Sequence, residues 1–227
     1  MHTQDKFKQN LLKKNAAQAA LDYMQERLNN KMVIGIGTGS TVNSFIELLD
    51  HKEHRFHAVV ASSKASADRL RKLHFDPTEP NQVSKIDVYI DGMDEINSHK
   101  QMIKGGGGAL TGEKILASMA DEFIAIGDDS KLVDCLGSFP IALEVIPIAR
   151  SFVAREIVKL GGDPVYRAGF ITDYGNAILD VYNLQISLAE QLEKDLNQIP
   201  GLVTNGIFAK RRADKVFISG VNGTKAF

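Results

Sequence analysis

Up to about residue 136, the pattern of hydrophobic and polar positions alternates between two periods. Apolar residues recur every three or four positions in four segments, which predicts amphipathic helices at residues 5–28, 40–49, 63–73 and 111–120. Short apolar runs alternate with them and predict buried strands at residues 31–34, 57–61, 86–90 and 122–126. Strands that alternate with helices favour right-handed crossovers. We therefore predict a Rossmann-like, mostly parallel sheet with helices on both faces.

The pattern changes beyond residue 136. Strands and helices now follow the order β-α-β-β-α-β of a ferredoxin-like module, and we predict them at residues 141–145, 149–160, 165–171, 177–181, 187–198 and 202–208. A last predicted strand, residues 215–219, is expected to return to the first sheet. The fold class is therefore α/β. We predict a Rossmann-like domain of residues 1–136 plus 207–227, with a smaller ferredoxin-like α+β domain, residues 137–206, inserted in it.

Composition excludes several classes of protein. The 227 residues carry a net charge of −1, which gives no electrostatic footprint for nucleic acid or for an anionic membrane. Cys135 is the only cysteine, so an internal disulfide is excluded, and its apolar neighbours favour a packing role. No apolar run approaches the roughly 20 residues that span a bilayer, and the first residues lack the apolar core of a signal peptide. We expect a soluble, cytoplasmic protein.

Residues 104–114 form the most unusual segment of the chain. Four consecutive glycines, residues 105–108, offer backbone N–H groups that no Cβ obstructs. Lys104 precedes these glycines, and Glu113 follows them at the start of a predicted helix. A cluster of acids, residues 91–95, follows the third predicted strand. A base, a cation and further acids beside a glycine loop are what proton transfer next to a carbonyl requires.

The segment Gly-Ile-Gly-Thr-Gly-Ser-Thr at residues 35–41 follows the first predicted strand. It lacks the third glycine of a dinucleotide fingerprint, since Ser40 stands there, and it lacks the lysine of a P-loop. A glycine turn with hydroxyls that opens a helix still suits a single phosphate group. The alternative is that Ser40 or Thr41 only caps the helix.

The acids at residues 91–95 also have alternative interpretations. They could form a turn and a helix cap, or they could bind a divalent metal. Metal binding is disfavoured, because His99 is the only histidine close in sequence and Lys104 would compete with a cation. His51, His54 and His57 lie in a charged connection that we interpret as a solvated loop.

These motifs together identify a family. The chain resembles ribose-5-phosphate isomerases of the A type, from about residue 5 to the end and in one order, at residues 35–41, 91–97, 102–114, 129–131, 144–147 and 199–204. Two departures are slight. Met93 stands where a small residue is usual, and Gly108 stands where alanine is frequent.

The resemblance implies an aldose–ketose isomerase of the non-oxidative pentose phosphate pathway. It would interconvert D-ribose 5-phosphate and D-ribulose 5-phosphate by metal-independent proton transfer through an enediolate. Glu113 is implied as the base, Lys104 and the loop amides as stabilisers of the enediolate oxygen, and Asp91 with Asp94 as groups for the sugar hydroxyls and ring opening. The implied substrate-binding residues are Thr38, Gly39, Ser40, Thr41, Asp91, Gly92, Met93, Asp94, Lys104, Gly105, Gly106, Gly107 and Lys131.

The implied partner is a small sugar phosphate, with no cofactor, no metal, no nucleic acid and no membrane. We expect a homodimer, with a tetramer as the alternative. Two other functions stay open, an enzyme related to amino-sugar-phosphate deaminases and a sugar-phosphate sensor without catalysis. A nicotinamide dehydrogenase is disfavoured by the incomplete dinucleotide fingerprint.

Overall fold

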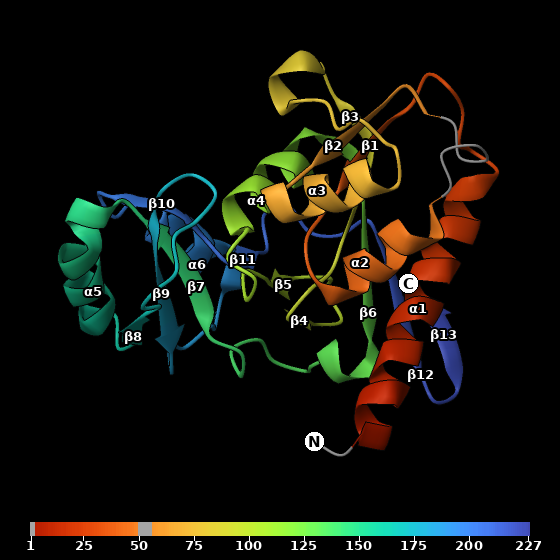
Figure 1. Ribbon diagram of the computed structural model, residues 1–227. Helices are drawn as coiled ribbons and strands as arrows, with labels where there is room; N and C mark the ends of the chain where they lie inside the picture. Colours follow the sequence, from red (N-terminus) through yellow and green to blue (C-terminus); the bar gives the residue numbers. More distant parts are fainter. Residues whose placement is uncertain (1–2, 50–55) are drawn as a thin grey trace. The chain divides into compact units, whose positions relative to one another are not determined.

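The computed structural model describes residues 3–49 and 56–227 (Figure 1). Two of the histidines considered above, His51 and His54, lie outside the described residues. The chain packs into two compact units, of which the first comprises Met1–Met93, Ile115–Leu132 and Ala213–Phe227. The second unit comprises Asp94–Lys114 and Val133–Arg212. The predicted domains assign residues 94–114, 133–136 and 207–212 differently. The domain bounds therefore stay a prediction, because compact units and domains need not share their bounds.

The first unit is built on a six-stranded sheet in the order β13-β12-β6-β3-β1-β2 (Figure 1). Its strands are β1 (Val33–Ile36), β2 (Ala58–Ala61), β3 (Ile86–Asp91), β6 (Ala120–Asp128), β12 (Lys215–Gly220) and β13 (Gly223–Ala226). All neighbours are parallel except β12 and β13, which form a hairpin. The predicted mostly parallel sheet is therefore confirmed. The carboxyl ends of β1, β3 and β6 meet at one edge of this sheet, where ligands of such folds bind.

Helices cover the first sheet through a shared apolar core. The helices of this unit are α1 (Thr3–Gln25), α2 (Ser40–Leu48), α3 (Lys64–Lys72) and the last turns of α4 (Leu110–Met119), and a 3₁₀ turn η1 (Pro80–Gln82) follows α3. Ala16 and Ala20 of α1 are small enough for close packing, and they join Phe45 of α2 and the strand residues Ile36 and Ile90 in one core cluster. None of the described helices could cross a membrane.

The second unit holds a four-stranded antiparallel sheet in the order β10-β7-β9-β8. Its elements are β7 (Ile141–Val145), η3 (Pro147–Ala149), α5 (Arg150–Lys159), β8 (Asp163–Tyr166), β9 (Ala177–Tyr182), α6 (Ala189–Leu196) and β10 (Leu202–Asn205). The last strand thus pairs with the first, and the predicted ferredoxin-like order is confirmed. A separate three-stranded sheet consists of β4 (Glu95–Ile96), β5 (Met102–Ile103) and β11 (Ile207–Phe208).

Two expectations from the hydrophobic pattern are wrong in this unit. The predicted strand at residues 202–208 is broken at Gly206, whose carbonyl accepts a hydrogen bond from the Lys104 amide at 2.9 Å. A Cβ on Gly206 would lie 2.2 Å from the Lys104 carbonyl oxygen, so the chain approaches Lys104 here and β11 joins a different sheet. Cys135 is exposed rather than packed, despite its apolar neighbours.

Candidate active site

The turn between β1 and α2 passes directly over Asp91. A Cβ on Gly37 would lie 2.0 Å from Asp91 Oδ1, so only glycine permits this approach. Gly39, with φ of 120°, is the N-cap of α2 and has no side chain to cap the helix. The alternative that Ser40 or Thr41 is the cap is therefore wrong. The first amides of α2 are at the positive end of the helix dipole, which suits an anion.

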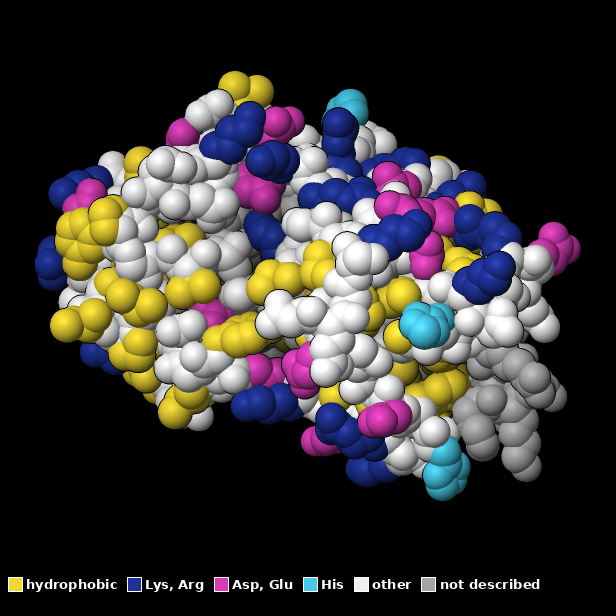
Figure 2. Space-filling model, turned by 90° about the horizontal axis from the view of Figure 1, so that it is seen from above, with side chains coloured by type: hydrophobic (Ala, Val, Ile, Leu, Met, Phe, Trp, Pro, Cys, Tyr) yellow, Lys and Arg dark blue, Asp and Glu magenta, His cyan; other side chains and the backbone are white. Residues whose placement is uncertain are grey.

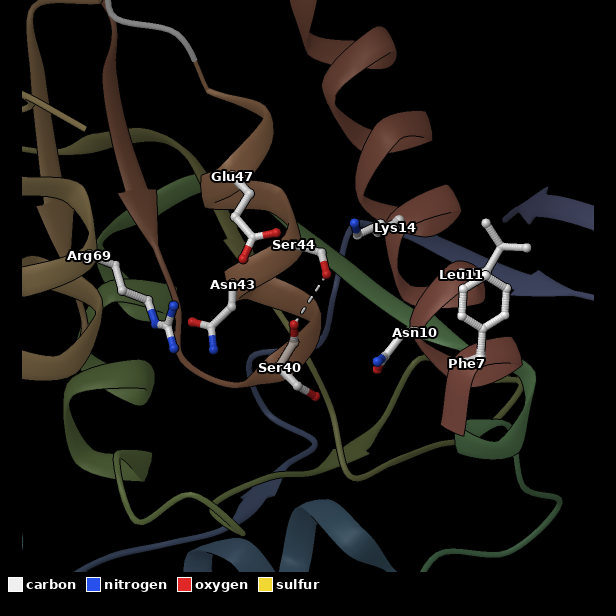
Figure 3. Close-up of a pocket in the computed structure, with 9 residues that line it drawn as sticks. All are labelled: Phe7, Asn10, Leu11, Lys14, Ser40, Asn43, Ser44, Glu47 and Arg69. Atoms are coloured by element: carbon white, nitrogen blue, oxygen red, sulfur yellow. Dashed lines mark hydrogen bonds between the residues drawn. The ribbon is translucent and has the colours of Figure 1, made fainter. Parts of the chain in front are cut away.

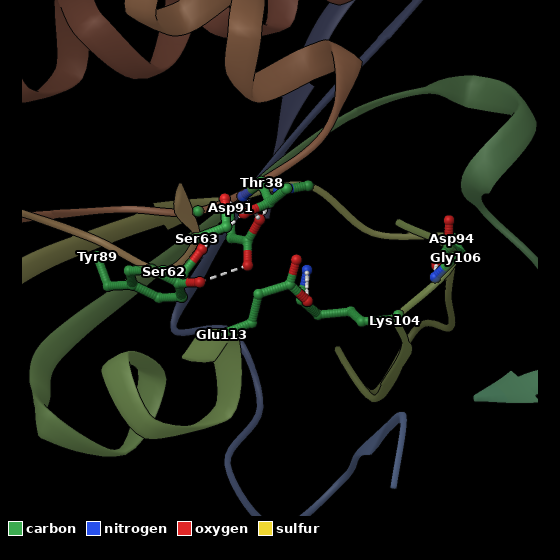
Figure 4. A network of polar contacts seen from close by, with 12 residues as sticks. Thr38, Ser62, Ser63, Tyr89, Asp91, Asp94, Lys104, Gly106 and Glu113 are labelled. Atoms are coloured by element: carbon green, nitrogen blue, oxygen red, sulfur yellow. Dashed lines mark hydrogen bonds and ion pairs between the residues drawn. The ribbon is translucent and has the colours of Figure 1, made fainter. Parts of the chain in front are cut away.

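Asp91 is fully buried, and three hydrogen bonds hold its carboxylate in place (Figure 4). Oδ1 accepts from the Thr38 amide at 3.1 Å and from the Gly92 amide at 2.7 Å. Oδ2 accepts from the Tyr89 hydroxyl at 2.5 Å. These contacts fix the position of the carboxyl group. Asp91 therefore anchors the turn before α2.

Hydroxyl groups from the second βα connection complete this turn. Thr38 Oγ1 lies 2.8 Å from Ser62 Oγ and donates to Ser63 Oγ at 2.7 Å. Ser66 Oγ donates to the Gly37 carbonyl at 2.6 Å. Ser63 is also the N-cap of α3 and accepts from the Ser66 amide. The conformation of Thr38 is thus set by contacts with residues more than 20 positions away, which the sequence motif alone does not reveal.

A pocket of about 420 Å³ opens beside the start of α2 (Figure 3). Residues of α1, α2 and α3 line it, among them Lys14, Ser40, Asn43 and Arg69. Lys13 Nζ of α1 donates to Ser40 Oγ at 3.0 Å. Lys13 has no signal in the sequence, because it lies in a polar stretch of a helix and only packing of α1 against α2 gives it a neighbour in the glycine turn.

Lys131 lies in the 3₁₀ turn η2 (Asp129–Lys131), directly after β6. Asp128 is the N-cap of this turn and accepts from the Ser130 amide at 3.2 Å. Two side chains lie against the preceding Gly127. A Cβ on this glycine would lie 2.6 Å from Met93 Sδ and 3.5 Å from Lys131 Cγ. Met93 and Lys131 therefore pack on the same glycine, near the edge of the sheet where the carboxyl ends of β1, β3 and β6 meet.

Lys104 and Glu113 form a buried ion pair in the second unit (Figure 4). Lys104 Nζ lies 3.2 Å from Glu113 Oε2, and the two residues are 2% and 4% exposed. Glu113 is in the first turn of α4. Lys104 Nζ also lies 5.6 Å from the centre of the Phe208 ring, a cation–π distance. A carboxylate and an ammonium group are thus held together with little exposure to solvent.

Packing accounts for glycine at three positions of the loop, which connects Lys104 to α4. A Cβ on Gly105 would lie 2.9 Å from Ala142 Cβ, and one on Gly106 would lie 2.9 Å from Asp94 Oδ1. A Cβ on Gly108 would lie 2.2 Å from Phe170 Cζ. Phe170 thus occupies the space that an alanine would need, which accounts for the departure noted at this position. A Cβ on Gly107 would meet nothing within 4 Å.

The predicted site residues fall into two groups. The first unit holds Thr38, Gly39, Ser40, Thr41, Asp91, Gly92, Met93 and Lys131, and the second holds Asp94, Lys104, Gly105, Gly106, Gly107 and Glu113. Within the second group, the Gly106 amide donates to Asp94 Oδ2 at 2.8 Å. In residues 3–49 and 56–227, no three His, Cys, Asp or Glu side chains are grouped so that they could hold a metal ion.

A family model described as ribose 5-phosphate isomerase A (phosphoriboisomerase A) matches residues 58–223. The chain belongs to this family. A ribose-5-phosphate isomerase A of Legionella pneumophila (strain Lens) is 57% identical over 217 residues, which cover 94% of this chain and 99% of that relative. A second model, described as a putative sugar-binding domain, matches residues 3–78.

Solved structures of isomerases agree with the fold. Ribose 5-phosphate isomerase A from Neisseria gonorrhoeae matches with a TM-score of 0.91 at 42% identity, over 96% of each chain. A D-ribose-5-phosphate isomerase solved in complex with phospho-erythronic acid matches with a TM-score of 0.90 at 35% identity, over 96% of this chain and 98% of the other. The resemblance stated from the motifs is confirmed along nearly the whole chain.

Proposed function

We propose that this protein interconverts D-ribose 5-phosphate and D-ribulose 5-phosphate. Membership of the ribose-5-phosphate isomerase A family supports the reaction, and the buried pair of Lys104 and Glu113 supports its chemistry. The aldose and the ketose differ only in the position of one carbon-bound proton and one hydroxyl proton. A base and a nearby cation are sufficient for that exchange.

In the proposed mechanism Glu113 takes the proton from C2 of the open-chain aldose. The electron pair of that bond moves into the C1–C2 bond and leaves negative charge on the O1 oxygen. Lys104 and the loop amides stabilise this enediolate oxygen. Glu113 then returns the proton to C1, while a proton moves from O2 to O1. Asp91 and Asp94 assist ring opening and hold the sugar hydroxyls.

We assign the phosphate group to the start of α2. Thr38, Gly39, Ser40 and Thr41 supply amides and hydroxyls there, and Lys131 supplies a positive charge at the same edge of the sheet. Lys13 is added to this set, since its ammonium group already contacts Ser40. Gly92 and Met93 complete the proposed substrate-binding residues of the first unit.

The proposal is tested by incubating the protein with ribose 5-phosphate in deuterium oxide and an excess of chelator. We expect ribulose 5-phosphate to form at the same rate as without chelator, with deuterium incorporated at the transferred position. Free ribose should be a very poor substrate, because binding of the phosphate positions the reacting carbons. Loss of turnover in chelator that a divalent ion restores would refute the metal-independent mechanism.

A parallel incubation with an amino-sugar phosphate, together with the assay above, separates the alternatives. An enzyme of the deaminase type would release ammonia from an amino-sugar phosphate. A sensor would bind ribose 5-phosphate without forming any product. Either result, together with no ribulose 5-phosphate, would overturn the proposed function.

We further propose a cytoplasmic homodimer. Exposed free Cys135 suits a reducing compartment, and large exposed apolar side chains suit an interface. Figure 2 shows yellow side chains gathered at one end of the face in view. The exposed large apolar residues of the second unit are Ile146, Ile148, Phe152, Val158, Leu160, Val165, Tyr166, Ile171, Tyr174, Tyr182, Leu188 and Val203.

A further inference from the structure

The carbonyl groups of the glycine loop are bound by an arginine that lies outside every motif discussed above. Arg167 Nη1 donates to the Gly106 carbonyl at 3.2 Å and to the Gly105 carbonyl at 3.4 Å, and Nη2 reaches the Gly105 carbonyl at 3.4 Å. We propose that Arg167, held by Asp180, is a positioning residue that orients and polarises the amides of this loop for the reaction. The inference rests on the proposed isomerase function.

The β8–β9 hairpin fixes the arginine in place. The Arg167 amide donates to the Ile178 carbonyl at 2.9 Å, and Val165 pairs with Asp180 across the two strands. Arg167, two residues beyond Val165, is therefore a diagonal neighbour of Asp180 on the same face. Its Nε donates to Asp180 Oδ2 at 2.9 Å and its Nη2 to Oδ1 at 2.5 Å. Both side chains are mostly buried.

The planarity of the peptide bond connects these contacts to the opposite side of the loop. In a trans peptide, the C=O and the following N–H point in opposite directions. The Gly105 carbonyl faces Arg167, and the Gly106 amide of the same peptide donates to Asp94 Oδ2 at 2.8 Å. The Gly106 carbonyl also faces Arg167, so the Gly107 amide points away from it.

The Gly107 amide is the group that this arrangement leaves for a ligand. Gly107 is exposed, and its amide makes no hydrogen bond within residues 3–49 and 56–227. A cation on the carbonyl of the same peptide makes the N–H a stronger donor, because linked hydrogen bonds polarise one another. An oriented amide that needs no rearrangement when charge develops is the property of an oxyanion site.

Only a guanidinium group can make this set of contacts. Its planar donors bind both oxygens of Asp180 and still reach two carbonyls, whereas a lysine is a single flexible cation. Asp180 also balances the charge of the arginine, which lets the guanidinium group lie mostly buried against the loop carbonyls. If Arg167 only stabilised the hairpin, its ion pair with Asp180 would be sufficient, and its hydrogen bonds to the loop carbonyls would not be needed.

The test compares Arg167→Ala and Arg167→Lys with Arg150→Ala. Arg150 is the matched control, because its guanidinium lies 4.3 Å over the ring of Tyr166 in the same hairpin and makes no hydrogen bond to the loop among the described residues. We expect kcat of Arg167→Ala to fall about 10-fold to 100-fold, somewhat less than the usual loss of a direct oxyanion donor, with KM changed by no more than about 3-fold. Arg167→Lys should recover little of the loss.

Two further measurements separate positioning from stability. Guanidinium ion at a non-denaturing concentration should restore part of the turnover of Arg167→Ala and none to Arg150→Ala. Affinity for phospho-erythronic acid, whose carboxylate resembles an enediolate, should fall more than affinity for ribose 5-phosphate.

Wild-type kcat in a folded Arg167→Ala or Arg167→Lys protein would overturn the inference. If Arg167→Ala does not fold, Arg167→Lys carries the test. An inactive wild type and an inactive Arg150→Ala would instead overturn the proposed function, and this inference with it.

Discussion

Two physical roles can be assigned to Glu113, one in stabilising the helix and one in catalysis, and an experiment separates them. An acid in the first turn of a helix interacts favourably with the helix dipole by about 0.3–1 kcal/mol, whether or not it is catalytic. Glu190 occupies the first turn of α6 in the same way. Glu113 is buried beside Lys104, whereas Glu190 is half-exposed and pairs with Lys194 at 2.9 Å.

We expect Glu113→Gln to reduce turnover by at least about 10²-fold to 10⁴-fold, because an amide cannot accept the C–H proton. Substrate affinity should change little, and exchange of the C2 hydrogen with solvent should be lost. Glu190→Gln is the control and should cost only a little stability. Turnover near the wild-type rate in folded Glu113→Gln would place the base elsewhere, most simply at Asp91.

Gly127 and Met93 give a second prediction at this scale. Gly127→Ala would bring a Cβ within 2.6 Å of Met93 Sδ, so we expect a loss of about 1–3 kcal/mol in the free energy of unfolding. Met93→Ala removes the clash, and the alanine at 127 fills part of the space left by methionine. The double variant should therefore be more stable than the sum of the single changes predicts, by about 0.5–3 kcal/mol.

Urea unfolding of the four proteins measures this coupling. Gly162→Ala is the control partner, because its Cβ would lie 2.8 Å from Val181 Cγ1 in the other unit. Gly162→Ala and Met93→Ala should be additive. Additivity of Gly127→Ala and Met93→Ala would contradict the contact.

At the scale of elements, a buried ion pair joins α4 to α6. Lys114 Nζ donates to Glu193 Oε1 at 2.8 Å and to the Ile207 carbonyl at 2.6 Å. Glu193 Oε2 in turn accepts from the amides of Ala209 and Lys210. Burial lowers the pKa of Lys114 from its ordinary value, while attraction to Glu193 acts in the opposite direction. The pair ties α4, α6 and the segment after β10 together.

We expect Glu193→Gln to destabilise the protein by about 3–5 kcal/mol, because Lys114 keeps its buried charge and loses its counterion. The loss of Glu193 should lower the pKa of folded Lys114 further. The unfolded chain then binds more protons than the folded one below the ordinary lysine pKa of about 10.4, so the stability of this variant should rise with pH in the alkaline range.

Thermal unfolding at neutral pH and near pH 9.5 tests both statements. The double variant Lys114→Met with Glu193→Gln is the control, and it should lose less stability than Glu193→Gln and show no such rise with pH. A pH-independent stability of Glu193→Gln relative to the wild type would show that Lys114 is not the group responsible.

At the scale of the whole molecule, the proposed homodimer predicts a mass in solution of about twice the 24.9 kDa of the chain. Ile148 is 93% exposed in the second unit, and apolar surface of this kind marks interfaces. Ile148→Asp should therefore shift the equilibrium towards monomer in sedimentation velocity. Val221→Asp is the control, since Val221 is also exposed but belongs to the first unit. A monomeric wild type would refute the homodimer.

The features of this protein that the sequence determined by itself are mostly local. Residues two, three or four positions apart set the period of a strand or helix, so β7 was predicted with its observed bounds and α2 to within one residue. The glycine loop and the glycine turn before α2 were recognised because their residues are consecutive. The order of the elements then predicted both main sheets, since crossovers of a given kind permit few topologies.

What only the tertiary structure decided depends on residues far apart in the chain. The two-residue strands β4 and β5 are too short to show a period, and the break at Gly206 follows from its contact with Lys104. Lys13 contacts Ser40 across 27 positions, and Arg167 contacts Gly106 across 61. Neither residue has a signal in its own neighbourhood, because its contact is with a partner that only folding brings within hydrogen-bond distance.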